Sequence, residues 1–241
     1  MATLFISDLH LDGSRPSAQN AFLRFLAEEA INADALYILG DLFEFWIGDD
    51  DPDPHYRKVT NALAKLTSSG VRCHIMHGNR DFMLGPDFFR ESGTIFLHDP
   101  SLIFVGGESV LLSHGDVLCT DDKSYQRYRR LVRHPLAQQM YNALPFRWRQ
   151  RITMKIRGNS MAQYGSRPVE ILDVNQQAVE DFLRGYRVNK LLHGHTHRPA
   201  FHSFDLDGKK AVRMVLGDWY ESASVLRWDR NGPQLQCTDF S

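Results

Sequence analysis

The stretch that decides the fold is TLFISDLH at residues 3–10, in which an apolar run ends directly in an Asp-x-His pair. Four further apolar runs end in the same kind of residue, and they are ALYILGD at 35–41, VRCHIMHGNRD at 71–81, SVLLSHGD at 109–116 and NKLLHGHTH at 189–197. Short apolar runs that alternate with helical stretches predict an α/β fold. Because ligands bind beyond the carboxyl ends of strands in such folds, we expect the five ends to converge in space.

The segments between these runs predict helices and hairpins. Residues 17–32 carry apolar side chains at helical spacing, with Ser17 as the expected N-cap, and residues 55–66 predict a second helix. Hairpins are expected at 101–113, through a Gly-Gly pair, and at 224–237, through an Asn-Gly turn.

Residues 123–167 interrupt this alternation. The segment shows helical patterns without a strand signal, and Pro135 and Pro145 are expected to divide it into separate helices. We therefore predict a core domain formed by residues 1–122 and 168–241, which carries a helical insertion at residues 123–167.

The charge of the chain is unevenly distributed. The 241 residues have a formal net charge of −1, which by itself argues against a nucleic-acid or anionic-membrane partner. The insertion nevertheless holds 11 Lys and Arg residues and no Asp or Glu. A nucleic-acid arm would explain its charge and a structural cap its apolar residues, whereas a lipid-handling lid at an anionic membrane explains both. We favour the lid and expect no nucleic-acid partner.

The N-terminus and the cysteines indicate the compartment. The first ten residues have no basic and apolar leader, and the three cysteines fit no paired metal or redox spacing. No apolar run approaches the length of a membrane span. We expect a cytoplasmic monomer whose contact with a membrane is peripheral.

In chain order the motifs form the series D-x-H, G-D, G-N-x-D, an isolated His and G-H-x-H. This series resembles the calcineurin-like metallophosphoesterase superfamily over residues 1–200. The resemblance implies an α/β fold built as an αββα sandwich of two mixed sheets, with the insertion as a lid. It also implies two metal sites that share Asp41. The first would be formed by Asp8, His10, Asp41 and His197, and the second by Asp41, Asn79, His114 and His195.

These ligand types also make chemical sense by themselves. Carboxylate, imidazole and amide groups without a thiolate suit a hard or borderline divalent ion such as Mn²⁺. Two such ions can clamp both sides of an in-line displacement at phosphorus and activate a water molecule. The expected reaction is hydrolysis of a phosphoester or phosphoanhydride without a covalent enzyme intermediate.

Arg80 departs from the superfamily pattern, in which many members have His after the Gly-Asn pair. A guanidinium does not donate a proton at neutral pH, but it can stabilise the charge of a phosphate. A phosphate monoester, whose second pKa is about 6, can leave without a proton donor. Arg80 therefore favours cleavage of a diphosphate linkage. The alternative is that His195 or a water molecule supplies the proton.

Longer strings narrow the resemblance to the UDP-2,3-diacylglucosamine pyrophosphatase family. They are FISDLHL at 5–11, LYILGDLFEFWIGDDD at 36–51, MHGNRDFMLG at 76–85, HGDVLCTDD at 114–122, GNS at 158–160, DVN at 173–175 and HGHTHRPA at 193–200. The resemblance implies hydrolysis of UDP-2,3-diacylglucosamine to UMP and 2,3-diacylglucosamine 1-phosphate, a step of lipid A biosynthesis. It further implies two Mn²⁺ ions per chain and a peripheral location on the cytoplasmic side of the bacterial inner membrane.

The same resemblance implies roles for individual residues. Asn79, Arg80 and His195 would be catalytic. The implied substrate contacts are Asn79, Arg80, Asp122, Ser160, Tyr164, Arg167 and His195. Tyr164 stands where the family often has Asn.

Other acidic and aromatic residues have supporting roles in this interpretation. Asp81 and Asp116 are expected to accept the second N–H of ligand histidines. The three aspartates at 49–51 are expected to form a solvated acidic loop, and Trp46 and Trp219 to pack in the core.

Two alternatives keep the same folded site. One is a two-metal nuclease or soluble nucleotide phosphatase, which the apolar content of the insertion disfavours. The other is a non-catalytic scaffold that binds partners, which the complete set of ligands disfavours. The expected partners of the preferred hypothesis are a lipid-linked nucleotide sugar and an anionic membrane surface.

Overall fold

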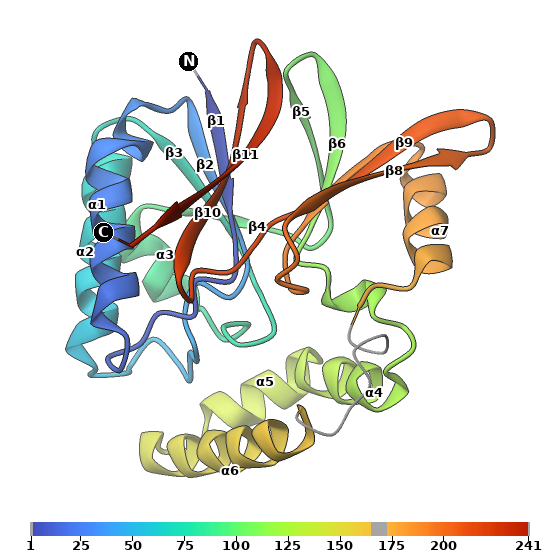
Figure 1. Cartoon of the computed structure of the whole chain (residues 1–241). Coiled ribbons are helices and arrows are strands. Elements are labelled where there is room, and N and C mark those ends of the chain that lie inside the picture. Colours follow the sequence, from blue (N-terminus) through green and yellow to red (C-terminus); the bar gives the residue numbers. More distant parts are fainter. Residues whose placement is uncertain (1, 165–172, 241) are drawn as a thin grey trace.

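Two mixed β-sheets form the centre of the computed structural model, which describes residues 2–164 and 173–240 (Figure 1). The first sheet has the order β11-β10-β1-β2-β3-β4 and contains β1 (Thr3–Ile6), β2 (Ala35–Leu39), β3 (Arg72–Met76), β4 (Ile95–Leu97), β10 (Ser222–Asp229) and β11 (Gly232–Asp239). The second has the order β5-β6-β7-β9-β8 and contains β5 (Ser101–Val105), β6 (Glu108–Ser113), β7 (Lys190–His193), β8 (Ala200–Leu206) and β9 (Lys209–Val215). Strands β1 to β4 are parallel, as are β6, β7 and β9, so their carboxyl ends share one side of the molecule.

Helices cover the outer face of each sheet. The helices α1 (Pro16–Glu28), α2 (Pro54–Ser68) and α3 (Pro86–Ser92) pack on the first sheet, and α7 (Gln176–Tyr186) packs on the second (Figure 1). Three apolar clusters fill the spaces between the layers, with Phe22 and Trp219 in the first, Phe5 and Leu192 between the two sheets, and Val179 under α7. The predicted αββα sandwich is therefore confirmed.

Several local predictions need correction. Helix α1 begins at Pro16, with Arg15 at the N-cap position and no side-chain cap, so Ser17 is not the N-cap. Proline is favoured in the first turn because it lacks the N–H that the turn leaves unpaired. The helix ends at Glu28, and residues 30–32 form the short 3₁₀ helix η1 (Ala30–Asn32). At the last hairpin the turn is Arg230-Asn231, because Gly232 already pairs with Asp229.

The acidic loop at residues 49–51 is not simply solvated. The Asp49 carboxylate accepts the backbone N–H groups of Gly85 and Asp87, each at 2.9 Å, and of Phe88 at 3.2 Å. It therefore satisfies the free amides at the start of α3. Sequence patterns also missed α3, whose 7 residues are too few to show a helical period. Trp46 and Trp219 are buried in the core, as predicted.

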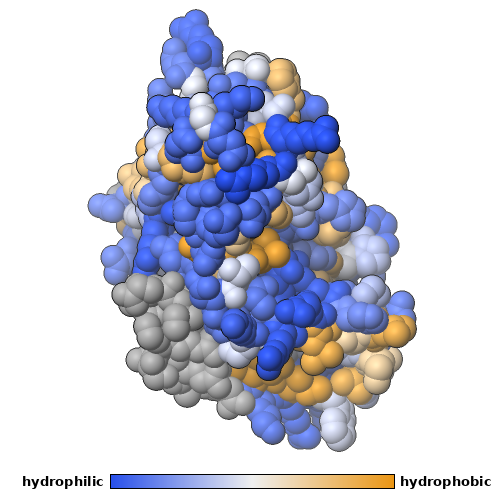
Figure 2. Space-filling view, turned by 90° about the vertical axis from the view of Figure 1, so that its right-hand side faces the viewer, coloured by the Kyte–Doolittle hydropathy of each residue, from blue (hydrophilic) through white to orange (hydrophobic). Residues whose placement is uncertain are grey.

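Within its described residues, 123–164, the insertion forms three helices, as its two prolines predicted. They are α4 (Lys123–Val132), α5 (Pro135–Asn142) and α6 (Phe146–Tyr164), and they lie beyond the carboxyl ends of the sheet strands (Figure 1). Large apolar side chains remain exposed on them, among them Met140 at 73% and Trp148 at 59%. Figure 2 shows hydrophobic and hydrophilic side chains intermixed on the lower part of the molecule. Within the described residues, no helix has the length and apolar character to cross a membrane.

Candidate metal centre

The residues predicted as metal ligands follow five strands and meet at the carboxyl side of the two sheets. Asp8 and His10 follow β1, Asp41 follows β2, Asn79 follows β3, His114 follows β6, and His195 and His197 follow β7. The five motifs are distant in sequence but adjacent in space, because parallel strands of both sheets deliver them to one side.

The first group consists of Asp8, His10 and His197, whose ligand atoms all lie within 4.8 Å of one another. Asp8 Oδ1 lies 3.2 Å from His197 Nε2 and 3.9 Å from His10 Nε2. The other carboxylate oxygen, Asp8 Oδ2, accepts hydrogen bonds from Ser7 Oγ at 2.6 Å and from the backbone N–H of His195 at 2.8 Å. Only Oδ1 is thus left to face the two imidazoles.

The second group consists of Asp8, Asp41 and His114, again with ligand atoms within 4.8 Å. Asp41 Oδ2 lies 3.8 Å from His114 Nε2 and 3.9 Å from His10 Nε2. This oxygen is therefore placed between the two groups. Asn79 joins the second group, because its Oδ1 lies 2.9 Å from His114 Nε2.

His195 lies beside the second group. Its ring centroid is 5.0 Å from that of His114, and the Tyr125 ring stacks on it with a centroid distance of 6.1 Å. Burial and the neighbouring His114 lower the pKa of His195 to about 3. The imidazole is therefore neutral at physiological pH, as a metal ligand must be.

The donor set fits divalent metal ions. Asp8 Oδ1 is buried and has no hydrogen-bond donor among the residues that the structure describes. Burial alone would raise the pKa of Asp8, but the surrounding imidazoles of His197, His114 and His10 hold it below its usual value. A buried, ionised oxygen that faces imidazole nitrogens is a suitable donor for a cation.

The backbone at the site is strained. Five candidate ligands have positive φ angles, namely Asp8 at 57°, His10 at 50°, Asp41 at 53°, His195 at 69° and His197 at 56°. Residues other than glycine rarely adopt this conformation, and when they do they are often found at functional sites. The folded core therefore holds these side chains in place at a cost of about 1–3 kcal/mol for each residue.

Two glycines allow the loops to approach closely. A Cβ atom at Gly78 would lie 2.0 Å from Asp41 Oδ1, and one at Gly194 would lie 2.3 Å from Asp8 Oδ2. Any side chain at either position would displace a candidate ligand, so both positions require glycine.

Groups outside the cluster lie close to the remaining ring nitrogens of the histidines. Glu44 Oε2 lies 3.2 Å from His10 Nδ1, and Asp218 Oδ2 lies 3.1 Å from His197 Nδ1. His114 Nδ1 lies 2.9 Å from the Leu39 carbonyl oxygen. These contacts leave the Nε2 atoms of the three histidines turned toward the cluster.

Asp81 and Asp116 do not play this role, contrary to prediction. Asp81 accepts the backbone N–H groups of Gly78 at 2.8 Å and Leu42 at 2.7 Å, so it ties the loop after β3 to the loop after β2. Asp116 accepts hydrogen bonds from Tyr125 Oη and Arg129 Nε, each at 2.7 Å. Both carboxylates are buried, and neither has a hydrogen bond to a candidate ligand histidine among the described residues.

Sequence reasoning missed Glu44 and Asp218. A signal for Asp218 existed, because the run AVRMVLGD at 211–218 ends in Gly-Asp after a strand, as the second motif does. Glu44 had no such signal, since its contact with His10 depends on how the loop after β2 folds back.

The predicted substrate residues are only partly described. The Arg80 side chain is 25% exposed at the rim of the cluster, with Nη1 3.7 Å from Glu44 Oε1. Asp122 is buried and caps α4, because its carboxylate accepts the Tyr125 backbone N–H at 2.9 Å. Ser160 and Tyr164 belong to α6, but their side chains are not described, and Arg167 lies outside the described residues.

We expect Glu44→Gln and Asp218→Asn each to weaken metal binding about 10- to 100-fold, since each removes a carboxylate charge beside a candidate ligand histidine. Competition with a metal chelator, followed by metal analysis of the protein, measures this loss. Asp181→Asn is the matched control, because Asp181 is exposed on α7 and its carboxylate contacts Gln177 and Arg184 of the same helix. Equal metal affinity in all three variants would contradict the assigned contacts.

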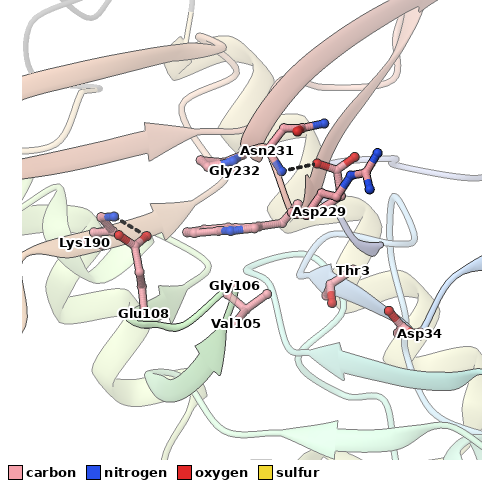
Figure 3. A pocket seen from close by; sticks show the side chains of 12 residues that line it. Thr3, Asp34, Val105, Gly106, Glu108, Lys190, Asp229, Asn231 and Gly232 are labelled. Carbon is pink, nitrogen blue, oxygen red and sulfur yellow. Dashed lines mark hydrogen bonds and ion pairs between the residues drawn. The ribbon is translucent and has the colours of Figure 1, made fainter. Parts of the chain in front are cut away.

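A separate cavity lies on the opposite side of the sheets. It has a volume of about 630 Å³, and its lining includes Thr3 at the start of β1, Lys190 at the start of β7 and the turn residue Asn231 (Figure 3). Glu108 and Lys190 form an ion pair on its wall. None of the candidate metal ligands lines this cavity, so it is distinct from the metal centre.

Comparison with known proteins identifies relatives over nearly the whole chain. Residues 1–199 match the family described as calcineurin-like phosphoesterase. The chain is 49% identical to a UDP-2,3-diacylglucosamine hydrolase of Edwardsiella ictaluri (strain 93-146), over 98% of this chain and 91% of the relative. It is also 49% identical to one of Pseudomonas aeruginosa (strain UCBPP-PA14), over 96% of this chain and 97% of the relative.

Among solved structures, an archaeal phosphodiesterase aligns with a TM-score of 0.49 and 13% sequence identity, covering 98% of this chain and 99% of that one. The family match and the near full-length relatives, together with a cluster suited to divalent metals, agree with each other. The chain belongs to the calcineurin-like phosphoesterase family and, within it, to the family of UDP-2,3-diacylglucosamine hydrolases.

Proposed function

We propose that the chain hydrolyses the diphosphate of UDP-2,3-diacylglucosamine to UMP and 2,3-diacylglucosamine 1-phosphate, a step of lipid A biosynthesis, with two Mn²⁺ ions. The observation that carries the proposal is the position of Asp41 Oδ2, which lies 3.9 Å from His10 Nε2 and 3.8 Å from His114 Nε2. One carboxylate oxygen between two donor groups suits a pair of cations that act on one phosphate. The names of the relatives support the substrate.

The proposed ligand sets follow from these groups. Asp8, His10, Asp41 and His197 would hold one ion, and Asp41, Asn79, His114 and His195 the other. When bound, such a pair supplies Lewis-acid activation of water and neutralises charge on the diphosphate. The protein contributes the geometry, because Glu44, Asp218 and the Leu39 carbonyl group turn three imidazoles toward the cluster.

Arg80 is the proposed charge-stabilising group for the diphosphate. Its guanidinium lies over the Phe45 ring, 5.2 Å from the ring centroid, and close to Glu44 at the rim of the cluster. A partly exposed guanidinium can meet a phosphate with two parallel N–H groups. Asn79 and the neutral His195 would contact the same group from inside the site.

The helical insertion at residues 123–167 is proposed as a lid on the core of residues 1–122 and 168–241. It lies beyond the strand ends that carry the cluster (Figure 1). Its 11 basic and no acidic residues, with exposed apolar side chains between them, suit a peripheral contact with an anionic membrane. We place this contact on the cytoplasmic side of the inner membrane and propose a monomer.

The double variant Met140→Ser/Trp148→Ser is expected to reduce binding to vesicles that contain anionic phospholipid by roughly tenfold, because it removes exposed apolar contacts with the membrane. Vesicle co-sedimentation measures the change. Phe104→Ser is the control, because Phe104 is 75% exposed but lies on β5 outside the insertion. Equal loss in the control, or no loss in the double variant, would argue against the membrane contact.

A substrate comparison tests the proposed function. We expect the Mn²⁺-loaded protein to hydrolyse UDP-2,3-diacylglucosamine at least 100-fold more efficiently in kcat/KM than UDP-N-acetylglucosamine, because the acyl chains add binding surface. DNA is expected to remain uncleaved. Preferred cleavage of DNA would contradict this function and indicate a nuclease, and preferred cleavage of a soluble nucleotide would indicate a nucleotide phosphatase.

A further inference from the structure

Arg149 differs from its neighbours in the basic insertion because it is buried. It is 3% exposed, whereas Arg147 and Arg151, two positions to either side on α6, are exposed. A buried guanidinium is stable only when its N–H groups are paired. The partners of Arg149 therefore indicate where the insertion is fixed to the core.

Core residues Ile47, Gly48 and Asp50 surround the guanidinium of Arg149. Arg149 Nη1 donates to the Ile47 carbonyl oxygen at 2.6 Å, and Nη2 pairs with the Asp50 carboxylate. Gly48 has a φ of 141°, and a Cβ atom there would lie 2.0 Å from Nη1. The glycine thus makes the space that the guanidinium occupies.

The segment of residues 47–50 that surrounds Arg149 is connected to Arg80 through Trp46. The residue before Ile47 is Trp46, whose backbone N–H donates to the Arg80 carbonyl oxygen at 3.2 Å. The Trp46 indole donates to Asp49 Oδ1 at 2.9 Å, which holds the same loop from its other end. The contacts of Arg149 with Ile47 and Asp50 therefore hold the loop whose Trp46 N–H bonds to the Arg80 carbonyl oxygen.

Arg133, the C-cap residue of α4, contacts the other side of the same segment. Its Nη2 donates to the Gly78 carbonyl oxygen at 3.0 Å and lies 3.4 Å from Asp116 Oδ2. Asp116 is fully buried and also accepts the hydroxyl of Tyr125 and the Nε of Arg129. The insertion thus contacts Gly78 directly on one side of Asn79, and it contacts Arg80 on the other side through the Trp46–Ile47 segment.

We infer that Arg133 and Arg149 are positioning residues: they hold the Gly78–Arg80 segment from two sides, so that docking of the insertion places Asn79 and Arg80 for the reaction. This inference rests on the proposed function, in which both residues contact the diphosphate. It goes beyond that function because it couples the insertion to chemistry at the core. A lid that only covers the substrate would need neither contact.

The decisive variant is Arg149→Met, which keeps the length of the side chain but removes its N–H groups. Because small displacements of a catalytic group cost about 100-fold, we expect kcat for detergent-solubilised UDP-2,3-diacylglucosamine to fall by about that factor while KM changes less than about threefold. Arg133→Met is expected to act in the same direction. Gln150→Met, at an exposed neighbouring position on α6, is the control and should keep wild-type kinetics.

A double-mutant cycle separates positioning from a general loss of structure. If Arg149 acts through the Gly78–Arg80 segment, Arg149→Met should lower kcat strongly in the wild type but by a clearly smaller factor in the Arg80→Ala background, where only its effect on Asn79 remains. Equal losses in both backgrounds, or a rise in KM with unchanged kcat, would overturn the inference. Should Arg149→Met fail to fold, Asp50→Asn removes the charge partner at an exposed carboxylate and should give a smaller loss of kcat with the same dependence on Arg80.

Amide hydrogen exchange provides a readout that does not depend on turnover. The Arg80 backbone N–H donates to Asp41 Oδ1 at 2.8 Å, so its exchange reports the placement of the segment. We expect Arg149→Met to speed exchange at residues 78–80 at least tenfold, while Gln150→Met leaves it unchanged. Unchanged exchange in Arg149→Met overturns the inference even if the wild-type protein proves to act on another substrate. Faster exchange in Arg149→Met, together with a wild-type protein that does not hydrolyse UDP-2,3-diacylglucosamine, would contradict the proposed function but not the positioning role of Arg149.

Discussion

The variant Asp41→Asn is expected to lose about 1,000-fold or more in kcat/KM, together with at least one of its bound metal ions. Asp41 Oδ2 lies between His10 and His114, so the loss of its charge affects both groups of ligands. Metal ions contribute several kcal/mol to such reactions, and each 1.4 kcal/mol corresponds to a factor of ten. Hydrolysis assays and elemental analysis of the purified variant measure the two losses.

Asn is the informative replacement at this position. Its amide oxygen can still accept the Arg80 backbone N–H that Asp41 Oδ1 accepts at 2.8 Å, so the local fold is retained. Asp239→Asn, an exposed site on β11, is the control for the loss of a carboxylate. Full activity with full metal content in Asp41→Asn would show that neither metal binding nor hydrolysis requires a carboxylate at position 41.

Arg80→Ala is expected to slow diphosphate hydrolysis by about 100- to 1,000-fold while metal content stays unchanged. Removal of one preorganised group that stabilises developing charge has this effect in other enzymes. Only the side chain is lost, and the Arg80 backbone groups that bond to Asp41 and Trp46 remain. Steady-state kinetics and metal analysis on the same samples separate the two effects.

A conservative variant at position 80 separates the effect of charge from that of the planar donor pair. Arg80→Lys keeps the charge but not the planar pair of donors, so its activity should lie between those of the wild type and Arg80→Ala. Wild-type activity in Arg80→Ala would indicate that His195 or a water molecule assists the leaving group, and that the departure from the His of related sequences has no catalytic meaning.

Strand ends made the central part of the site predictable. Asp8, Asp41 and His114 each follow an apolar run, and the parallel strands of both sheets bring these ends together. The same rule extended to Asp218, but a single Gly-Asp after a strand is also an ordinary turn. The role of Asp218 follows only from its position in the structure, 3.1 Å from His197 Nδ1.

Residues that act through tertiary contacts could not be found in the same way. Asp49 stands in a run of three aspartates that suggested a solvated loop, yet it binds the start of α3. Arg149 is one of 11 basic residues in the insertion, and composition cannot distinguish the buried one from those in solvent. Local pattern predicts which face or end a residue occupies, whereas its partner depends on how distant loops pack.

Hydrolysis in ¹⁸O-labelled water identifies both the substrate and the phosphorus atom that water attacks. The Mn²⁺-loaded protein is incubated with UDP-2,3-diacylglucosamine, and both products are identified by mass spectrometry. We expect UMP and 2,3-diacylglucosamine 1-phosphate, with one ¹⁸O atom in UMP, because water attacks the phosphorus next to uridine and the lipid phosphate leaves. Absence of turnover, alongside cleavage of DNA or of a soluble dinucleotide, would contradict this expectation.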